Sequence, residues 1–552
     1  MSGADAPTRY HRSRSTPIPP EIGSTTYDLA VIGAGINGCG IARDAAMRGL
    51  QVLLVDKGDI GAQTTAWSTR LIHGGLRYLE RFELSLVRES LRERLTLLTI
   101  APHLVKPMQF LAPIYRGSRR GPMAMRAGML AYDALSFGKR LPRHRMLSRE
   151  EALACEPGLN ARELLGASLY YDAQVTFPER LALENALSAR EHGCDVVTYL
   201  RVESIQATPN QGITLAMRDE LEGVTLRVTA SAVVNATGPW VDEIAGKLGS
   251  ERLVGGTKGS HVVVAPFPGA PGRAVYAEAA TDRRPFFVIP WNGMYLIGTT
   301  DVRHQGDPAL ATASTDETDY LIAQAVAMFP RSGLAASSVL YTYSGVRPLR
   351  LSRRGPESAI TRRHSVVRHE PPFSTALSIV GGKLTTYREL AEQATDRVFD
   401  VLRRPDPGPS TASTPLPGAS VNTAPASNGG DAEAIDPDVE GRLRGIYGTR
   451  SEAVAGFAAS RANMRVFPGT ALLQMEPAFG IEHELAQTLE DVLMRRAMVG
   501  LSAKNGASVT AQALEALSVH AGWSSERCNA EREDFERYLS RFAAPRSAGL
   551  ER

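Results

Sequence analysis

Residues 27–57 read YDLAVIGAGINGCGIARDAAMRGLQVLLVDK, and this stretch decides the fold. Residues 29–32 are continuously apolar, which predicts a parallel strand covered on both faces. The strand runs into a G-x-G-x-x-G turn made by Gly33, Gly35 and Gly38. The first glycine permits a sharp bend, the second lets backbone amides approach a pyrophosphate, and the third lets the next helix pack closely. Phosphates would then lie at a helix N-terminus, where free N–H groups and the helix dipole favour negative charge.

The second half of the same stretch completes a nucleotide-binding unit. Gly49 ends the helix, residues 52–55 predict a second strand, and Asp56 follows at its end. An acid about 20 residues beyond the glycines accepts hydrogen bonds from ribose hydroxyls. It also argues against a ribose 2′-phosphate, and hence against NADP. Strand, turn, helix, strand and acid in this order predict an α/β fold that binds an adenine dinucleotide.

The composition is that of a soluble enzyme. The chain has 552 residues and a formal net charge of +3, so we expect two to four domains and no nucleic-acid partner. The four cysteines lack C-x-x-C spacing, so we predict neither a metal site nor disulfides, and a reducing compartment. No apolar run is long enough to span a bilayer, and residues 1–24 are expected to be a disordered tail.

Two more glycine turns follow strand-like segments further along the chain. Residues 232–235 lead into the turn at 236–240, and residues 376–380 lead into GGKLTTY at 381–387, with a helix predicted over 386–402. All three turns could face one cofactor.

Other segments indicate two further units. The alternation at 260–265, 286–290 and 294–299 is typical of an antiparallel sheet, which would form a second domain over the cofactor. Residues 405–431 have the composition of a flexible linker. Beyond them, a small helical domain is indicated by apolar residues at helical spacing, namely Ile481, Leu485, Leu489, Val492, Leu493, Leu514 and Leu517. That stripe fits a core or docking surface better than a cofactor site.

Ten strings, in order, carry a specific resemblance. They are INGCGIARDAAMRGL (36–50), LIHGGLRYLE (71–80), APHLVKPM (101–108), VNATGPW (234–240), KGSHVVV (258–264), FVIPW (287–291), IGTTD (297–301), YSGVRPL (343–349), AITR (359–362) and GGKLTTYREL (381–390). From residue 27 to about residue 497, the chain resembles the FAD-dependent glycerol-3-phosphate dehydrogenases of the aerobic, respiratory type.

The resemblance implies a Rossmann-like FAD-binding domain, an antiparallel-sheet substrate domain and a helical C-terminal domain. We place the FAD-binding domain at 25–105, 175–255 and 340–403, and the substrate (cap) domain at 106–174 and 256–339. A linker at 404–436 and a helical domain at 437–545 complete the chain.

The same resemblance implies a set of residues around non-covalent FAD. These are Gly33, Gly35, Gly38, Asp56, Thr64, Thr65, Ser68, His73, Gly74, Val202, Thr237, Gly238, Gly382, Lys383, Leu384 and Thr385. The string TTAWST departs from the family, which more often has a serine-rich run there, and Trp67 is the departing residue.

The substrate side is rich in cationic donors. A substrate phosphate carries about two negative charges near neutral pH, and arginine forks match its oxygens bidentately. By the resemblance, Arg77, Tyr78 and Arg362 would hold the phosphate of sn-glycerol 3-phosphate, while Arg347, Lys383 and His261 would surround the carbinol carbon.

The reaction implied is oxidation to dihydroxyacetone phosphate, with a hydride passing from C2 to flavin N5. His261 is the candidate base, since an imidazole accepts a proton near neutral pH, and Arg347 or Lys383 would stabilise the alkoxide. His73 is the second histidine considered, and it could instead pack beside the flavin.

Residues 116–145 bear on the electron acceptor. They interleave eight arginines and lysines with three methionines, and Asp133 is their only acid. Such a stretch suits an anionic membrane surface, although a solvated face over a helical core is equally compatible with it. The resemblance favours quinone as acceptor and a cytoplasmic enzyme attached peripherally to the inner face of the cell membrane. The alternative is a glycerol-3-phosphate or amine oxidase that reduces oxygen to hydrogen peroxide. A homo-oligomer is left open.

Overall fold

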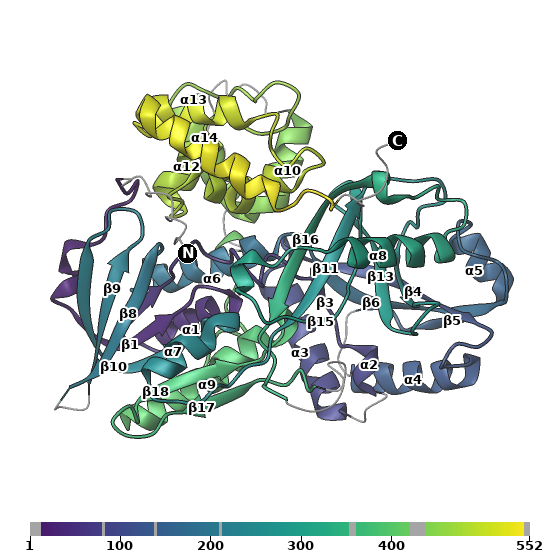
Figure 1. Ribbon diagram of the computed structural model, residues 1–552, viewed down its shortest axis with the longest axis horizontal. Coiled ribbons are helices and arrows are strands. Elements are labelled where there is room, and N and C mark those ends of the chain that lie inside the picture. Colours follow the sequence, from purple (N-terminus) through teal and green to yellow (C-terminus); the bar gives the residue numbers. More distant parts are fainter. Residues whose placement is uncertain are drawn as a thin grey trace, which may run out of the picture.

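A computed structural model describes residues 13–79, 83–136, 141–208, 212–352, 360–419 and 436–545. Two β-sheets lie side by side, and the C-terminal helices cover one end of both (Figure 1). The predicted α/β class, with a second sheet and a helical C-terminal domain, is confirmed.

The first sheet has eight strands in the order β17-β18-β10-β1-β2-β7, and β9 joins β8 to β10. The strands are β1 (Thr26–Ile32), β2 (Val52–Val55), β7 (Asp195–Val197), β8 (Leu200–Ala207), β9 (Ile213–Asp219), β10 (Thr225–Asn235), β17 (Ser365–Arg368) and β18 (Ala376–Val380). One face packs on helices, and the other packs on the β8–β9 ribbon. Burial on both faces explains why residues 29–32 are apolar without alternation.

Strand register brings the predicted turns together. Strands β2, β1, β10 and β18 are parallel, with Ile32 opposite Val55 and Asn235, and Asn235 opposite Ser378. Because parallel strands end at one edge, the three glycine turns that follow β1, β10 and β18 meet there, as the sequence predicted.

The second sheet has ten strands, most of them antiparallel. They are β3 (Leu71–Ile72), β4 (Val105–Tyr115), β5 (Arg145–Leu147), β6 (Leu164–Val175), β11 (Thr257–Val264), β12 (Ala274–Glu278), β13 (Pro285–Trp291), β14 (Met294–Gly298), β15 (Val302–Arg303) and β16 (Val339–Arg347). Three of them, β11, β13 and β14, correspond to the predicted alternating segments. Two boundaries were wrong, because β3 and β16 belong to this sheet and not to the nucleotide-binding unit: β3 pairs with β6, and β16 pairs with β11.

The helices connect and cover these sheets. They are α1 (Ile36–Met47), α2 (Leu76–Leu79), α3 (Leu84–Ile100), α4 (Pro122–Leu135), α5 (Arg149–Cys155), α6 (Pro178–Glu191), α7 (Val241–Lys247), α8 (Thr315–Met328), α9 (Tyr387–Leu402), α10 (Pro437–Tyr447), α11 (Ser451–Ser460), α12 (Glu476–His483), α13 (Thr510–His520) and α14 (Ser525–Ser540). The helix predicted over 386–402 is α9, which packs with α6 against α1. No helix in the described part of the chain is long and apolar enough to cross a membrane.

The C-terminal apolar stripe is buried, as expected for a core, but it does not lie on one helix. Leu485 adopts φ +61°, α12 ends at His483, and a π-helical turn at Asp491–Arg496 (η9) follows. The break between α12 and η9 begins at Glu484, whose buried carboxylate accepts hydrogen bonds from Arg180 and Arg450.

The segments predicted to be a disordered tail and a flexible linker are partly ordered. Arg14 donates to Asp219 and to the carbonyl of Thr198, which ties residues 13–24 to the β8–β9 ribbon. In the predicted linker, Thr411 donates to Asp44 and Leu416 is fully buried. Residues 1–12 and 420–435 lie outside the described residues.

Candidate active site

A cavity of about 1860 Å³ opens at the edge where the glycine turns meet. It is lined by most of the predicted site residues, namely Gly33, Gly35, Asp56, Thr64, Thr65, Ser68, His73, Val202, Thr237, Gly238, His261, Arg347, Arg362, Gly382, Lys383, Leu384 and Thr385. Gly38 and Gly74 do not line it. Arg77 and Tyr78 belong to α2, and their side chains lie outside the described residues.

The phosphate-loop glycines are required by close backbone contacts. Gly33 has φ +107°, and a Cβ there would lie 2.7 Å from the carbonyl oxygen of Ala236. A Cβ on Gly38 would lie 1.8 Å from the carbonyl oxygen of Gly33, so no larger residue fits between turn and helix. Ile36 and Asn37, the first two residues of α1, line the cavity.

Asp56 lies at the end of β2, where it was predicted. Its carboxylate accepts from the backbone N–H of Ala34 at 2.6 Å and from that of Gly58 at 2.8 Å. Burial raises its pKa, and these two hydrogen bonds oppose that change. Asp56 thus ties two loops of the cavity wall together, and its contact with ribose stays a prediction.

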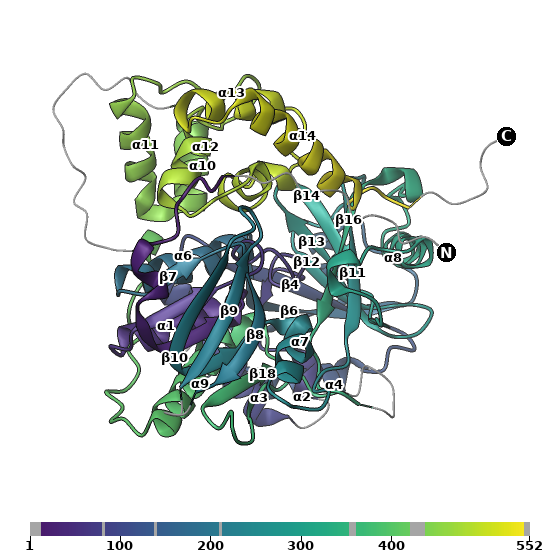
Figure 2. The same ribbon diagram turned by 60° about the vertical axis from the view of Figure 1, so that its left-hand side comes forward.

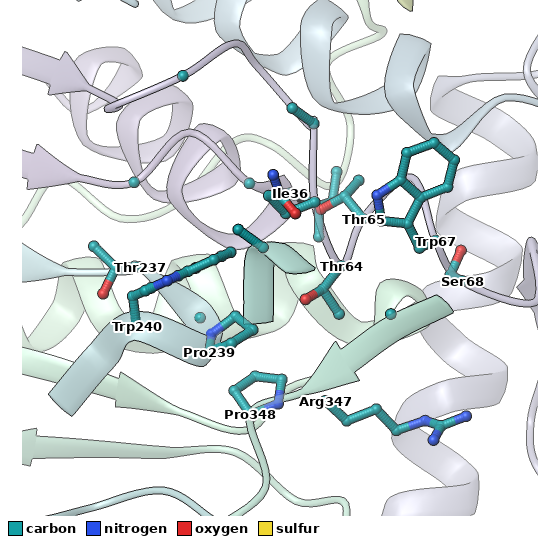
Figure 3. Close-up of a pocket in the computed structure, with 18 of the residues that line it drawn as sticks. Ile36, Thr64, Thr65, Trp67, Ser68, Thr237, Pro239, Trp240, Arg347 and Pro348 are labelled. Carbon is teal, nitrogen blue, oxygen red and sulfur yellow. Dashed lines mark hydrogen bonds between the residues drawn. The ribbon is translucent and has the colours of Figure 1, made fainter. Parts of the chain in front are cut away.

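Hydroxyl groups line the middle of the cavity. Thr65 accepts from the backbone N–H of Ile36 at 3.0 Å, and Thr64 donates to the carbonyl of Val346 at 2.7 Å. In Figure 3, Thr64 and Thr65 lie between Thr237 and Trp240 at one end and Trp67 and Ser68 at the other. These threonines are already engaged in holding the loop to α1 and β16.

A group of cationic side chains surrounds Asp301 at the substrate end. Arg347 donates to this carboxylate at 3.2 Å and to the hydroxyl of Thr299 at 3.1 Å, and Arg362 donates to the other carboxylate oxygen at 3.1 Å. Burial would raise the pKa of Asp301, but the charges of Arg347 and Arg362 outweigh burial and lower it. The two arginines, predicted to serve different parts of the substrate, therefore lie against one acid.

Strand register makes room for Arg347. On β11, Gly259 faces Gly345 of β16, and a Cβ on Gly259 would lie 2.1 Å from the Arg347 guanidinium. The glycine in KGSHVVV is therefore a space requirement of the site.

His261 is buried in the cavity wall. Its Nε2 lies 3.0 Å from the hydroxyl of Thr69, and its ring stacks on Tyr343 with centroids 4.8 Å apart. Burial, together with the charges of Arg347 and Arg70, holds its pKa well below the usual value for histidine. The imidazole is therefore neutral near pH 7.

Lys383 follows the third glycine turn. Burial lowers the pKa of its amine to about 7, and the nearby carboxylates of Glu89 and Glu83 only partly oppose this. His73 also lines the cavity, with its pKa lowered by burial and its ring edge-on to Phe287. Burial thus disfavours the charged form of both imidazoles and brings the pKa of Lys383 to about 7.

Comparisons with known proteins agree with this geometry. Residues 28–388 match the family model described as FAD dependent oxidoreductase, and residues 409–528 match that of the C-terminal domain of alpha-glycerophosphate oxidase. A glycerol-3-phosphate dehydrogenase from Synechocystis sp. is 42% identical over 547 residues, which cover 95% of this chain and 98% of that protein. The chain belongs to the FAD-dependent glycerol-3-phosphate dehydrogenase family.

Two further proteins are similar to the chain over most of its length. A D-erythritol 1-phosphate dehydrogenase from Brucella abortus is 36% identical, over 85% of this chain and 94% of that protein. A crystal structure of the glycerol-3-phosphate dehydrogenase from Bacillus halodurans complexed with FAD is 28% identical, with a TM-score of 0.76 over 95% of this chain and 96% of that one.

FAD is the cofactor of the family, and the residues present fit it. The cavity is long enough to run from the phosphate loop to the cationic cluster, and its walls carry buried polar atoms that need partners. Among the described residues, Asn37 Oδ1, Trp67 Nε1 and His261 Nδ1 have no hydrogen-bond partner. The phosphate loop and Asp56 would hold the adenosine end, and bound FAD would supply a hydride acceptor at the other.

Several cavity residues were missed from the sequence. The arginines around Asp301 include Arg284, and the same part of the cavity wall contains Asp301 itself and Thr299. Elsewhere in the cavity wall, Lys57 lies 4.2 Å over the ring of Trp240. The string IGTTD contains Thr299 and Asp301, so it could have been read as part of the site. The C-terminal domain also contributes cavity residues that gave no signal, because only its packing brings them there. Among them are Arg537 and Tyr538 of α14 and Arg541 just after that helix.

Proposed function

We propose that the protein oxidises sn-glycerol 3-phosphate to dihydroxyacetone phosphate and passes the electrons to a quinone. The observation that carries the substrate assignment is the cluster of Arg284, Arg347 and Arg362 around Asp301 in the cavity wall. Asp301 is the acid that pairs with two of them, so the cluster keeps a net positive charge. Such a site suits a substrate phosphate better than a neutral amine.

In this proposal, Lys383 takes the proton from the C2 hydroxyl. A general base works best when its pKa lies near the working pH, and a pKa of about 7 meets that condition. His261, the base expected from the sequence, is a poorer proton acceptor because its pKa is held well below the usual value. Its neutral ring would instead orient the hydroxyl through a hydrogen bond.

The arginines divide the remaining tasks. Arg347 adjoins His261 and is proposed to stabilise the developing alkoxide. Arg362 is proposed to bind the phosphate, and the resemblance assigns Arg77 and Tyr78 to the same task. Asp301 holds Arg347 and Arg362 in place before substrate arrives, so the site loses little side-chain freedom on binding.

Anaerobic mixing with substrate tests this assignment. Glycerol 3-phosphate should bleach the oxidised flavin, and glycerol, which lacks the phosphate, should not. D-Erythritol 1-phosphate, the substrate in the name of the Brucella relative, tests how strictly the site selects the length of the substrate's carbon chain. Reduction by glycine or sarcosine in place of glycerol 3-phosphate would refute the substrate assignment.

The proposed acceptor is supported by the outer face of α4. Met123 is 79% exposed and Leu130 is 58% exposed, while Met125 and Met129 of the same helix are buried. Arg116, Arg119, Arg126, Arg143 and Arg145 are exposed on and around it. Apolar side chains ringed by arginines suit the headgroup region of an anionic membrane. We therefore propose a cytoplasmic enzyme bound peripherally to the inner face of the cell membrane, where quinone is available.

Two measurements test the acceptor. Anionic vesicles should sediment the protein at low salt, and Arg119→Glu with Arg126→Glu should abolish this, while Arg397→Glu on the exposed side of α9 should not. Equal sedimentation with neutral vesicles would contradict membrane binding. In air, turnover that releases stoichiometric hydrogen peroxide would favour the alternative of an oxidase.

A further inference from the structure

The C-terminal domain holds one wall of the cofactor cavity through a buried ion cluster. Asp59 accepts from Arg496 at 2.7 and 2.8 Å and from Arg495 at 2.5 Å, and all three side chains are at most 2% exposed. Burial would raise the pKa of Asp59, but the two guanidinium charges outweigh burial and lower it. The carboxylate is therefore charged, and it depends on η9 of the C-terminal domain for its counter-charges.

Asp59 lies in the loop that follows β2, at residues 56–59, and all four of these residues line the cavity. Within this loop, Gly58 donates to Asp56, and its carbonyl accepts from the backbone N–H of Tyr199. The hydroxyl of Tyr199 in turn donates to Asp491 of η9 at 2.6 Å. The loop thus lies between the cavity and the C-terminal domain, bound to the latter on two sides.

The far end of the C-terminal domain holds a second loop. The carbonyl of Phe542 accepts from the backbone N–H of Thr342 on β16 at 2.8 Å, and its ring packs 5.1 Å from Trp67. Trp67 belongs to the same loop as Thr65 and Thr64, which are hydrogen-bonded to α1 and β16 respectively. Figure 2 shows α14 running across the top of the molecule and ending close to β16.

We propose that the C-terminal domain is a clamp for FAD, which fastens the 56–59 loop through Arg495 and Arg496 and the 64–68 loop through Phe542. Loosening either contact frees a loop that encloses the cofactor, so FAD should dissociate faster although neither Arg496 nor Phe542 lines the cavity. By linkage, FAD should tighten the docking of the C-terminal domain by the same factor. This role concerns cofactor retention and is independent of the proposed substrate and acceptor.

The chain offers a matched control. The carboxylate of Glu484 also accepts from two arginines, Arg180 of α6 at 2.6 and 2.9 Å and Arg450 at 2.7 Å, and Arg180 and Glu484 are fully buried. The backbone carbonyl of Glu484 accepts from Arg496 at 2.7 Å, a bond that Phe542→Ala leaves in place. The pair of Arg180 and Glu484 likewise joins the C-terminal domain to the rest of the chain, but neither residue lines the cavity. Arg180→Met and Arg496→Met therefore each remove one of two arginines from a buried carboxylate, and only the carboxylate paired with Arg496 lines the cavity.

The test is the rate of FAD release from the purified holoenzyme, followed by the rise in flavin fluorescence after dilution. Arg496→Met and Phe542→Ala should release FAD about ten-fold faster than the unaltered protein, and Arg180→Met should stay within about two-fold of it. Hydrogen exchange across residues 488–497 should also slow when FAD is added to apoprotein.

Unchanged release from both Arg496→Met and Phe542→Ala would overturn the clamp. Equal acceleration by Arg180→Met would also overturn it, because general loosening of the domain would then explain the effect. If Arg496→Met does not fold, Phe542→Ala against Arg180→Met decides by the same comparison.

Discussion

Lys383 should set the pH at which the flavin is reduced. With a pKa of about 7, its amine is neutral in about one molecule in ten at pH 6 and in about nine in ten at pH 8. If Lys383 is the base, the rate of flavin reduction by glycerol 3-phosphate should therefore rise about ten-fold between these values, with a midpoint near pH 7. Anaerobic stopped-flow absorbance at saturating substrate measures this rate directly.

The substitution Glu89→Gln tests the direction in which the midpoint of this pH profile moves. Among the charges that raise the pKa of Lys383, Glu89 comes first and Glu83 second. Removing the Glu89 charge destabilises the ammonium form, so the midpoint should move to lower pH and the rate at pH 6 should increase. Glu83→Gln should move the midpoint in the same direction by less. Lys383→Arg should abolish the rise of the rate between pH 6 and 8, together with most of the rate itself. A midpoint that moves upward in Glu89→Gln, or a profile that is flat from pH 6 to 8, would refute Lys383 as the base.

Three further outcomes test the packing of the site. Gly38→Ala places a Cβ against the backbone carbonyl of Gly33, which cannot move aside as a flexible side chain can. The purified protein should therefore contain little FAD, and full flavin content would contradict this. Gly259→Ala should displace only the Arg347 guanidinium, so FAD content should stay normal while the rate of flavin reduction by glycerol 3-phosphate falls at least about ten-fold, as expected for a lost charge-assisted bond to the developing alkoxide. Lys383→Met should stabilise the fold at pH 6, where both folded and unfolded Lys383 are protonated and burial of the charge opposes folding. That gain should shrink as pH rises from about 7 towards 10.5, because the unfolded state then binds more protons than the folded state, and thermal unfolding at several pH values checks it.

Local signals predicted the nucleotide-binding unit well. The strand, turn, helix and second strand of residues 27–57 lie within one continuous segment, and their apolar periodicity and glycines are local requirements. The predicted strand at 376–380 matches β18, and the helix at 386–402 matches α9 with the short turn before it. By contrast, β16 was placed in the wrong unit, because its partner β11 lies about eighty residues earlier and pairing leaves no local pattern.

The sequence by itself determined the class of fold, the cofactor loop and the residue types of the site, since the resemblance fixed those types position by position. Only the tertiary structure decided their chemistry. It set Arg347 and Arg362 on one carboxylate, and it buried Lys383 and His261, so that the pKa of Lys383 falls to about 7 and that of His261 lies well below its usual value. It also brought Asp59 to Arg496, which lies 437 residues away in the chain. Charge, burial and distance between remote segments are properties of packing, and a pKa depends on all three.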